Sequence, residues 1–122
     1  MKNYKESGPK QSIIKKILLK KEGYMSDKVD YWISEVCYKN NHIDSVRIYK
    51  DSDIVYGLEE IWTVKSVIDT INNGYNVSTM INKNGRWFAG ANVEVVNLYG
   101  TNYIRTDRDA SAEDNLENLP KF

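Results

Sequence analysis

The sequence predicts a small α+β domain, and three observations carry this prediction. The chain has 122 residues, a length that suits one globular domain. One segment, residues 63–74, has the apolar spacing of an amphipathic helix, whereas most other apolar residues after position 30 fall in short β-branched and aromatic runs. Turn-forming residues separate those runs at hairpin distances. We therefore expect a small curved antiparallel sheet with one packed helix, in the order strand-strand-helix-strand-strand-strand-strand.

The first two strands are expected at residues 32–38 and 43–49, because both runs are rich in β-branched and aromatic side chains. The polar residues between them, 39–42, have the length of a hairpin connection. Residues 50–53 supply turn chemistry, and residues 54–60 lead to the helix as a loop or a short strand. The two strands are thus predicted to form an antiparallel pair.

The helix is the clearest local signal in the chain. Thr63 is of the type that caps a helix N-terminus with its hydroxyl, and Gly74 provides the left-handed residue that often follows a helix C-terminus. Between them an apolar stripe repeats at helical spacing; it consists of Val64, Val67, Ile68 and Ile71. This stripe is expected to pack on the sheet.

After the helix, residues 76–81 are expected to pair with residues 86–88 through Asn84-Gly85, the strongest short signal for a tight hairpin turn. Gly90 is an isolated glycine in a strand-like run, which indicates a bulge or a close backbone approach. Residues 92–99 and 103–106 then flank Gly100 and form a last hairpin.

The zero net charge of the chain hides an asymmetry. Residues 1–25 carry seven Lys and two Glu, hence +5, whereas residues 26–122 carry ten Lys or Arg and fifteen Asp or Glu, hence −5. We expect residues 1–29 to form a basic N-terminal extension with an amphipathic helix, and residues 30–122 to form the single domain. Two interpretations of the extension stay open: it contacts acidic protein, membrane or nucleic acid, or the native protein starts at Met25.

Composition excludes several classes of protein. An acidic domain is a poor match for a dedicated binder of duplex nucleic acid, which relies on clustered Lys and Arg. One cysteine, Cys37, and one histidine, His42, allow no internal disulfide and no zinc site of the usual kind. We therefore predict no metal and no cofactor. No apolar run is long enough to span a bilayer and no secretory signal is evident, so a cytoplasmic location is expected.

The C-terminal tail predicts its own docking on the domain. Disordered termini are normally polar, but this one places Leu116, Leu119 and Phe122 at three-residue spacing with Pro120 among them. The tail follows Arg105 at the end of the last predicted strand. Arg105 has two open roles: it pins the tail by pairing with acidic residues, or it holds a phosphate or carboxylate ligand.

Residues of about 30–122 resemble an uncharacterised family of small bacterial and mobile-element proteins, catalogued as a domain of unknown function. The specific part of the resemblance is the ending, an I-R-T-D strand end at 104–107 followed by D-N-L-x-x-L-P-x-F at 114–122. Weaker anchor points are Trp32-Ile33, Val46, Trp62-Thr63, Val67-Ile68, Gly74 and Trp87 with Gly90. The resemblance implies a fold, but no activity, and it does not extend to residues 1–29.

The predicted binding surface combines cations with aromatic rings, which stack on bases or on other flat groups. We expect its residues to share one face or edge of the sheet with the docked tail; they are Arg86, Trp87, Tyr99, Tyr103 and Arg105. The carboxylate pairs at Glu59-Glu60 and at Asp107 with Asp109 lack the spacing of a known metal or catalytic motif. No catalytic residue is therefore predicted.

Three classes of function stay open. The first, which we favour, is a non-enzymatic binding or adaptor module for an unknown protein. The second is a protein that binds or sequesters a small anionic ligand such as a nucleotide or oligonucleotide, by analogy with small phage and mobile-element proteins. The third is an enzyme with an unrecognised site. An open sheet edge in this topology also allows a homodimer.

Overall fold

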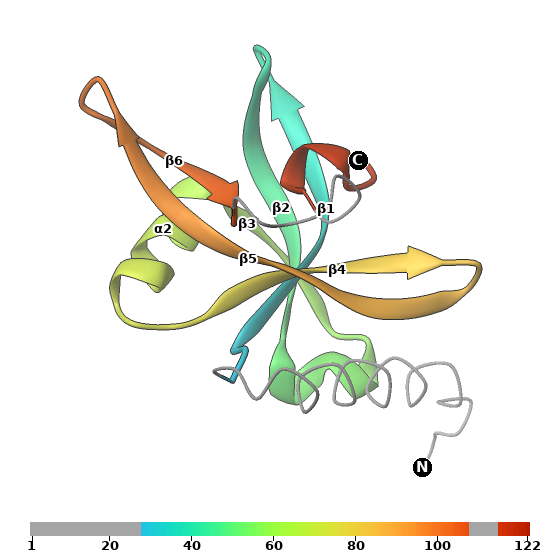
Figure 1. Cartoon of the computed structure of the whole chain (residues 1–122). Coiled ribbons are helices and arrows are strands. Elements are labelled where there is room, and N and C mark those ends of the chain that lie inside the picture. The colour runs from blue at the N-terminus through green and yellow to red at the C-terminus, as the bar shows by residue number, and fades with distance from the viewer. Residues whose placement is uncertain (1–27, 108–114) are drawn as a thin grey trace.

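The computed structural model describes residues 28–107 and 115–122, so the predicted N-terminal helix lies outside the described residues. One sheet of six strands runs in the order β3-β2-β1-β4-β5-β6 (Figure 1). The strands are β1 (Tyr31–Lys39), β2 (His42–Lys50), β3 (Glu59–Thr63), β4 (Val77–Lys83), β5 (Arg86–Leu98) and β6 (Thr101–Thr106). The helical elements are α2 (Val64–Asn72) and the 3-10 turns η2 (Asp51–Tyr56) and η4 (Leu116–Asn118).

The α+β class with one packed helix holds, but three details of the prediction were wrong. The sheet is mixed rather than antiparallel, because β1 and β4 run parallel. Of the two alternatives for residues 54–60 the short strand is correct in part, since β3 begins at Glu59, and three strands instead of two therefore precede the helix. The two strands predicted at 86–88 and 92–99 are one continuous strand, β5.

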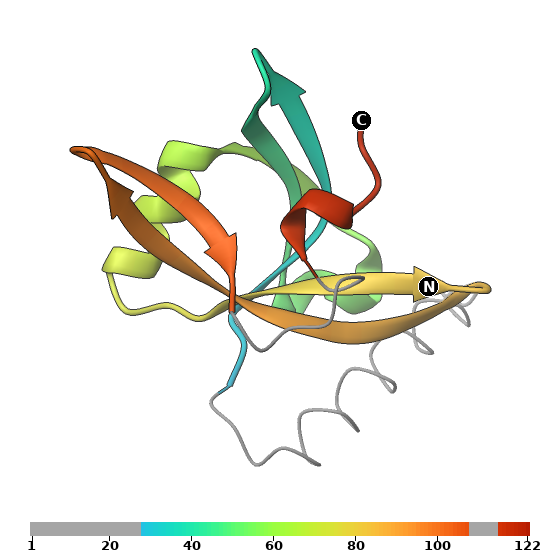
Figure 2. The same cartoon turned by 45° about the horizontal axis from the view of Figure 1, so that its top comes forward.

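The sequence predicted all three hairpins, and local turn chemistry explains two of them. The β1–β2 turn places Asn40 and Asn41 at φ values of 53° and 66°. The β4–β5 turn uses Asn84-Gly85, with φ values of 55° and 84°. Two successive left-handed residues match the right-handed twist of paired strands, which is why Asn and Gly are favoured there. The hairpins extend from the centre of the sheet as three separate arms (Figures 1 and 2).

The helix α2 begins at the predicted cap, where the Ser66 N–H donates to Thr63 Oγ1 at 3.2 Å. Val67 and Ile68 are buried on its inner side. The helix contacts both edge strands, β3 and β6, and thereby spans the two ends of the strand order. Within residues 28–107 and 115–122, no helix has the length and apolar character needed to cross a membrane.

Two clusters of buried side chains cover opposite faces of the sheet. Trp32 and Ile33 are adjacent in β1 and therefore point to opposite faces, and both are fully buried. Trp32 packs with Ile54 of η2 and with Met80, while its Nε1–H donates to Asp51 Oδ1 at 2.7 Å. Ile33 belongs to the larger cluster, which gathers side chains from the sheet, from α2 and from the tail.

The tail closes an edge of β1. β1 pairs with β4 only over Tyr31–Ile33, so the second half of β1 has no strand on that side. The tail fills this gap: the Val36 N–H donates to the Pro120 carbonyl, and the Phe122 N–H donates to the Val36 carbonyl, each at 3.0 Å. Leu116 and Leu119 lie in the larger core cluster, with 3% and 1% of their surface exposed.

Gly90 marks a bulge in β5, as the sequence predicted. Ser78 pairs with Asn92 but Met80 pairs with Ala89, so β5 contains one extra residue at this point. A Cβ on Gly90 would overlap Thr79 Oγ1 and press on the Thr79 carbonyl. The Thr79 hydroxyl oxygen accepts the Ala91 N–H at 2.9 Å, which fixes the bulge. The bulge bends β5 without ending it.

We expect Gly90→Ala to lower the free energy of unfolding by about 1–3 kcal/mol, because the added methyl group overpacks a buried backbone contact. Urea denaturation measures this loss. Gly74→Ala is the control, since a Cβ at Gly74 meets no atom within 4 Å and costs only the strain of its φ of 97°. A Gly90→Ala variant as stable as the wild type would contradict the close approach at Gly90.

A second prediction concerns the tail. Leu119→Ala should lower the free energy of unfolding by about 2–4 kcal/mol, because Leu119 is 1% exposed and contributes to the main core. Phe122→Ala should cost less, about 1–2 kcal/mol, because Phe122 is 38% exposed and its ring only partly covers Arg47. Thermal and urea unfolding compare the two variants. A Leu119→Ala variant as stable as the wild type would show that the tail does not hold the core together.

Candidate functional site

A pocket of about 480 Å³ opens between the β1–β2 arm, the strand β6 and the tail. Figures 1 and 2 show the two arms diverging with η4 near their base. Val64, at the start of α2, also contributes to the lining. The polar and aromatic lining residues include Tyr38, His42, Tyr103, Arg105, Asn115 and Glu117. Residues distant in sequence thus share one concave site.

One wall of the pocket is formed by β6, whose backbone has a free side. The Asp107 N–H donates to the Asn92 carbonyl at 2.8 Å, and hydrogen-bonded pairs alternate along an antiparallel ladder. Tyr103 and Arg105 therefore bond to β5 through their backbones, whereas Ile104 and Thr106 direct their N–H and C=O groups away from β5. Among the described residues, β6 pairs only with β5.

The opposite wall comes from the β1–β2 arm. Its left-handed Asn40-Asn41 turn ends at His42, whose ring centroid lies 6.2 Å from that of Tyr103 across the pocket. Tyr38, on the same arm, has Lys121 Nζ 5.3 Å from its ring centroid. Aromatic groups therefore face the pocket from both sides, and one of them is covered by a cation of the tail.

The floor joins β6 to the tail. The Thr106 hydroxyl donates to Asn115 Oδ1 at 3.0 Å. Among residues 28–107 and 115–122, Arg105 pairs with the neighbouring strand β5 and not with the tail: its Nε–H donates to Glu94 Oε2 at 2.7 Å. The pocket thus contains one arginine that is already paired with a carboxylate, and its lining also includes the carboxylates of Asp107 and Glu117.

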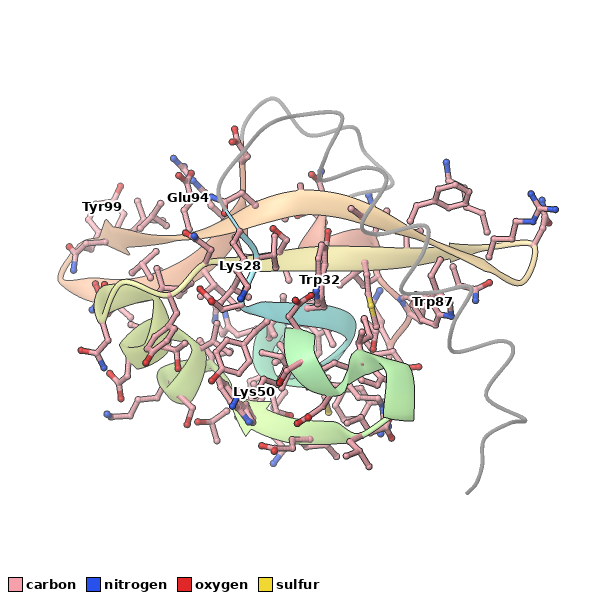
Figure 3. All side chains as sticks on the ribbon, turned by 90° about the horizontal axis from the view of Figure 1, so that it is seen from below. Lys28, Trp32, Lys50, Trp87, Glu94 and Tyr99 are labelled. Atoms are coloured by element: carbon pink, nitrogen blue, oxygen red, sulfur yellow. The ribbon has the colours of Figure 1, made fainter. Side chains whose placement is uncertain are left out.

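The structure brings together only part of the predicted surface. Tyr103 and Arg105 both line the pocket, but Tyr99 lies at the tip of the β5–β6 arm. Arg86 and Trp87 begin β5, at the far end of the same strand (Figure 3). At about 3.3 Å per residue, Trp87 and Tyr99 are separated by on the order of 40 Å along β5. They therefore form no common surface, and Trp87 packs on the cluster around Trp32.

A comparison with protein families matches residues 32–120 to the family described as "Protein of unknown function (DUF3892)". The chain belongs to this family. The match confirms the resemblance predicted over about 30–122, and it includes the tail as far as Pro120. Neither the comparison with curated proteins nor the comparison with solved structures finds a match.

The pocket of this DUF3892 domain was not predictable from local patterns. Tyr38, His42, Asn115 and Glu117 carry no motif that connects them, and the first and last of these are far apart in the chain. Only the non-local packing of the tail beside β1 brings them together. The one available signal was the apolar spacing in the tail, which predicts docking but not its position.

A second polar cluster of the DUF3892 domain lies on the outer face of β1, β2 and β3. Arg47 donates from Nε to Glu35 at 2.7 Å and from Nη1 to Glu59 at 2.6 Å, and the hydrogen bond with Glu35 contributes most to raising the Arg47 pKa. The Phe122 ring stacks on the guanidinium, with its centroid 4.5 Å from Cζ. This cluster holds the last residue of the tail against the sheet.

Both carboxylates of the Glu59-Glu60 pair accept hydrogen bonds from other side chains of the domain. Glu59 accepts from Arg47 and from the Tyr49 hydroxyl, while Glu60 Oε1 accepts the Trp62 Nε1–H at 2.8 Å. Within the described part of the chain, no group of three His, Cys, Asp or Glu side chains lies close enough to hold a metal ion. The cluster is therefore a structural ion-pair network.

Tyr49 gives this network a measurable pH dependence. Burial, followed by its hydrogen bond to Glu59, raises the pKa of Tyr49 from 10.0 to about 12. The contribution of Tyr49 to stability should therefore be complete below about pH 10 and be lost as the pH rises toward 12. Tyr49→Phe should flatten the stability curve in that window. Ultraviolet difference absorbance between wild type and variant follows the ionisation; a midpoint near 10 would contradict the assignment.

Proposed function

We propose that the protein is a non-enzymatic binding module that accepts an extended segment of a partner protein in the pocket. The segment adds a strand to the free edge of β6. The single observation that carries this proposal is that a strand edge with no pairing partner among residues 28–107 and 115–122 forms one wall of an open pocket of about 480 Å³. Main-chain hydrogen bonds would supply affinity, and the pocket would select among side chains.

The composition of β6 supports this role. Exposed edges are normally protected by Lys, Pro or bulges, because unpaired N–H and C=O groups attract other strands. β6 contains neither Lys nor Pro, and no bulge interrupts its pairing with β5. Its one charged residue, Arg105, is paired with Glu94. This edge is thus poorly defended against pairing, as expected for a strand that receives a partner.

The tail supplies an example of the same chemistry within one chain. It fills the free edge of β1 with two backbone hydrogen bonds through Val36, and it places two leucines in the core. A short extended segment with apolar residues is therefore sufficient to complete an open edge in this fold. We infer that a partner segment does at β6 what the tail does at β1.

A small anionic ligand is the second candidate, favoured by the rings of His42 and Tyr103 and by Arg105 in one pocket. Stacking between rings suits a nucleotide base. The charges argue against it, because Arg105 is already paired with Glu94 and the lining also includes two carboxylates. A rise in melting temperature with added mononucleotides, lost in Tyr103→Ala, would favour this candidate over the peptide.

The cytoplasmic location and the homodimer predicted from sequence stay part of the proposal. A second copy also carries β6 at an edge of its sheet, so two chains could pair through their β6 edges. Sedimentation at increasing protein concentration separates this outcome from binding of a foreign segment.

The decisive test uses a phage-displayed library of linear peptides selected against the whole chain. Enriched peptides should bind Thr106→Pro at least tenfold more weakly than wild type, because proline removes an outward N–H from the edge of β6. Thr106→Val is the matched control. It removes only the hydroxyl that donates to Asn115, and binding should stay within about threefold of the wild type.

Two results would contradict strand addition. One is a selection that enriches no peptide. The other is a set of peptides that bind Thr106→Pro and Thr106→Val equally well, which would place the binding site elsewhere on the domain.

A further inference from the structure

We propose that the tip of the β5–β6 arm, Leu98-Tyr99, is a second interaction surface that inserts into an apolar groove of a protein partner. This surface is distinct from the pocket, since neither Leu98 nor Tyr99 lines the pocket. A partner at this tip would therefore bind independently of a segment at β6.

The chain contains its own comparison for this tip. The turns of the β4–β5 and β5–β6 arms have the same backbone: Asn84 and Tyr99 both have a φ of 55°, and Gly85 and Gly100 both have a φ of 84°. Each turn is also fixed by an asparagine three residues before its glycine. The Gly85 N–H donates to Asn82 Oδ1 at 3.0 Å, and the Gly100 N–H donates to Asn97 Oδ1 at 3.3 Å.

The two turns differ in the residues that they present. The β4–β5 turn carries Lys83-Asn84, which is polar and suits the left-handed conformation. The β5–β6 turn carries Leu98-Tyr99 instead. A tyrosine in the left-handed region is uncommon, and nothing in the turn geometry requires it, because the other arm builds the same turn with asparagine.

Burial does not explain Tyr99 either. Its exposed fraction is 104%, so Tyr99 gains no packing inside this chain, and the exposed fraction of Leu98 is 51% (Figure 3). Strained residues that the fold itself does not require concentrate at functional positions. A side-chain hydrogen bond joins the two strands next to the tip, where Asn97 Nδ2 donates to Asn102 Oδ1 at 2.9 Å. An exposed aromatic and aliphatic pair on a hydrogen-bonded turn is typical of an interface anchor.

The charge pattern identifies the kind of partner. Residues 95–104 contain no charged side chain, in a chain in which 28% of residues are charged. Arg105, which follows this run, is paired with Glu94. A surface that binds anionic lipid needs Lys or Arg beside its apolar tip, and this arm lacks an unpaired one. An uncharged apolar groove on a protein is therefore the matching partner.

The test places a photoreactive benzophenone amino acid at position 99 of the whole chain in host cells. Position 84 is the matched control, because it has the same turn and backbone angles. Crosslinking to one protein from position 99, and not from position 84, is expected. The captured protein is then purified, and its affinity for variants of the chain is measured.

Tyr99→Asn and Leu98→Lys should each weaken that affinity at least tenfold, whereas Asn84→Tyr should change it less than twofold. Tyr99→Asn should also raise the melting temperature by about 2–5 °C, because asparagine relieves the left-handed strain. Loss of affinity with a gain in stability cannot arise from misfolding.

Three results would overturn the proposal. They are equal crosslinking from positions 84 and 99, unchanged affinity of the captured protein for Tyr99→Asn, and Tyr99-dependent binding to vesicles of phosphatidylcholine and phosphatidylglycerol in place of a protein. None of these results involves the edge of β6, so they leave the strand-addition proposal to its own test with Thr106→Pro.

Discussion

β1 and β4 pair in parallel over three residues only, Tyr31–Ile33 against Val77–Thr79, and then separate. The rest of the structure depends on this early separation. It exposes the second half of β1, which the tail must cover, and it opens the sheet into three arms instead of a continuous surface. The helix α2 contacts both edge strands and the tail packs into the main core. Of these two segments, the tail satisfies the backbone groups of β1 that the separation left open.

Two of the strand edges in the described part of the chain therefore have different outcomes. The edge of β1 is completed from within, by Val36 hydrogen bonds to the tail and by buried leucines. The edge of β6 faces a pocket and, among the described residues, meets no further strand. Because an unpaired edge attracts extended segments, we propose that a partner segment binds at β6 and not at β1. The tip of the β5–β6 arm is the second proposed contact. There Tyr99 takes the position that Asn84 has in the β4–β5 turn.

Local signals in the sequence predicted the local structure. Asn84-Gly85 predicted its turn, Thr63 predicted the start of the helix, and Gly90 predicted a bulge, because each of these depends on the φ or the hydrogen bond of one residue. The spacing of Leu116 and Leu119 likewise predicted burial. The parallel pairing of β1 with β4 had no local signal, since it follows from the path of the chain through α2. The pocket depends on that pairing and was not predicted. Of the five residues in the predicted binding surface, only Tyr103 and Arg105 line the pocket, whereas Trp87 and Tyr99 lie far apart.

Native-state amide hydrogen exchange, resolved residue by residue by NMR, tests the central claim most directly. In the free protein, the backbone groups at the edge of β1 should be hydrogen-bonded to the tail, and those at the outer edge of β6 should be exposed to solvent. The amides of Val36 and Phe122, which donate to Pro120 and Val36, should be protected. The amides of Ile104 and Thr106 should exchange rapidly, although they lie in a regular strand. Rapid exchange at Val36, or protection at Ile104 and Thr106 without a partner, would contradict the account.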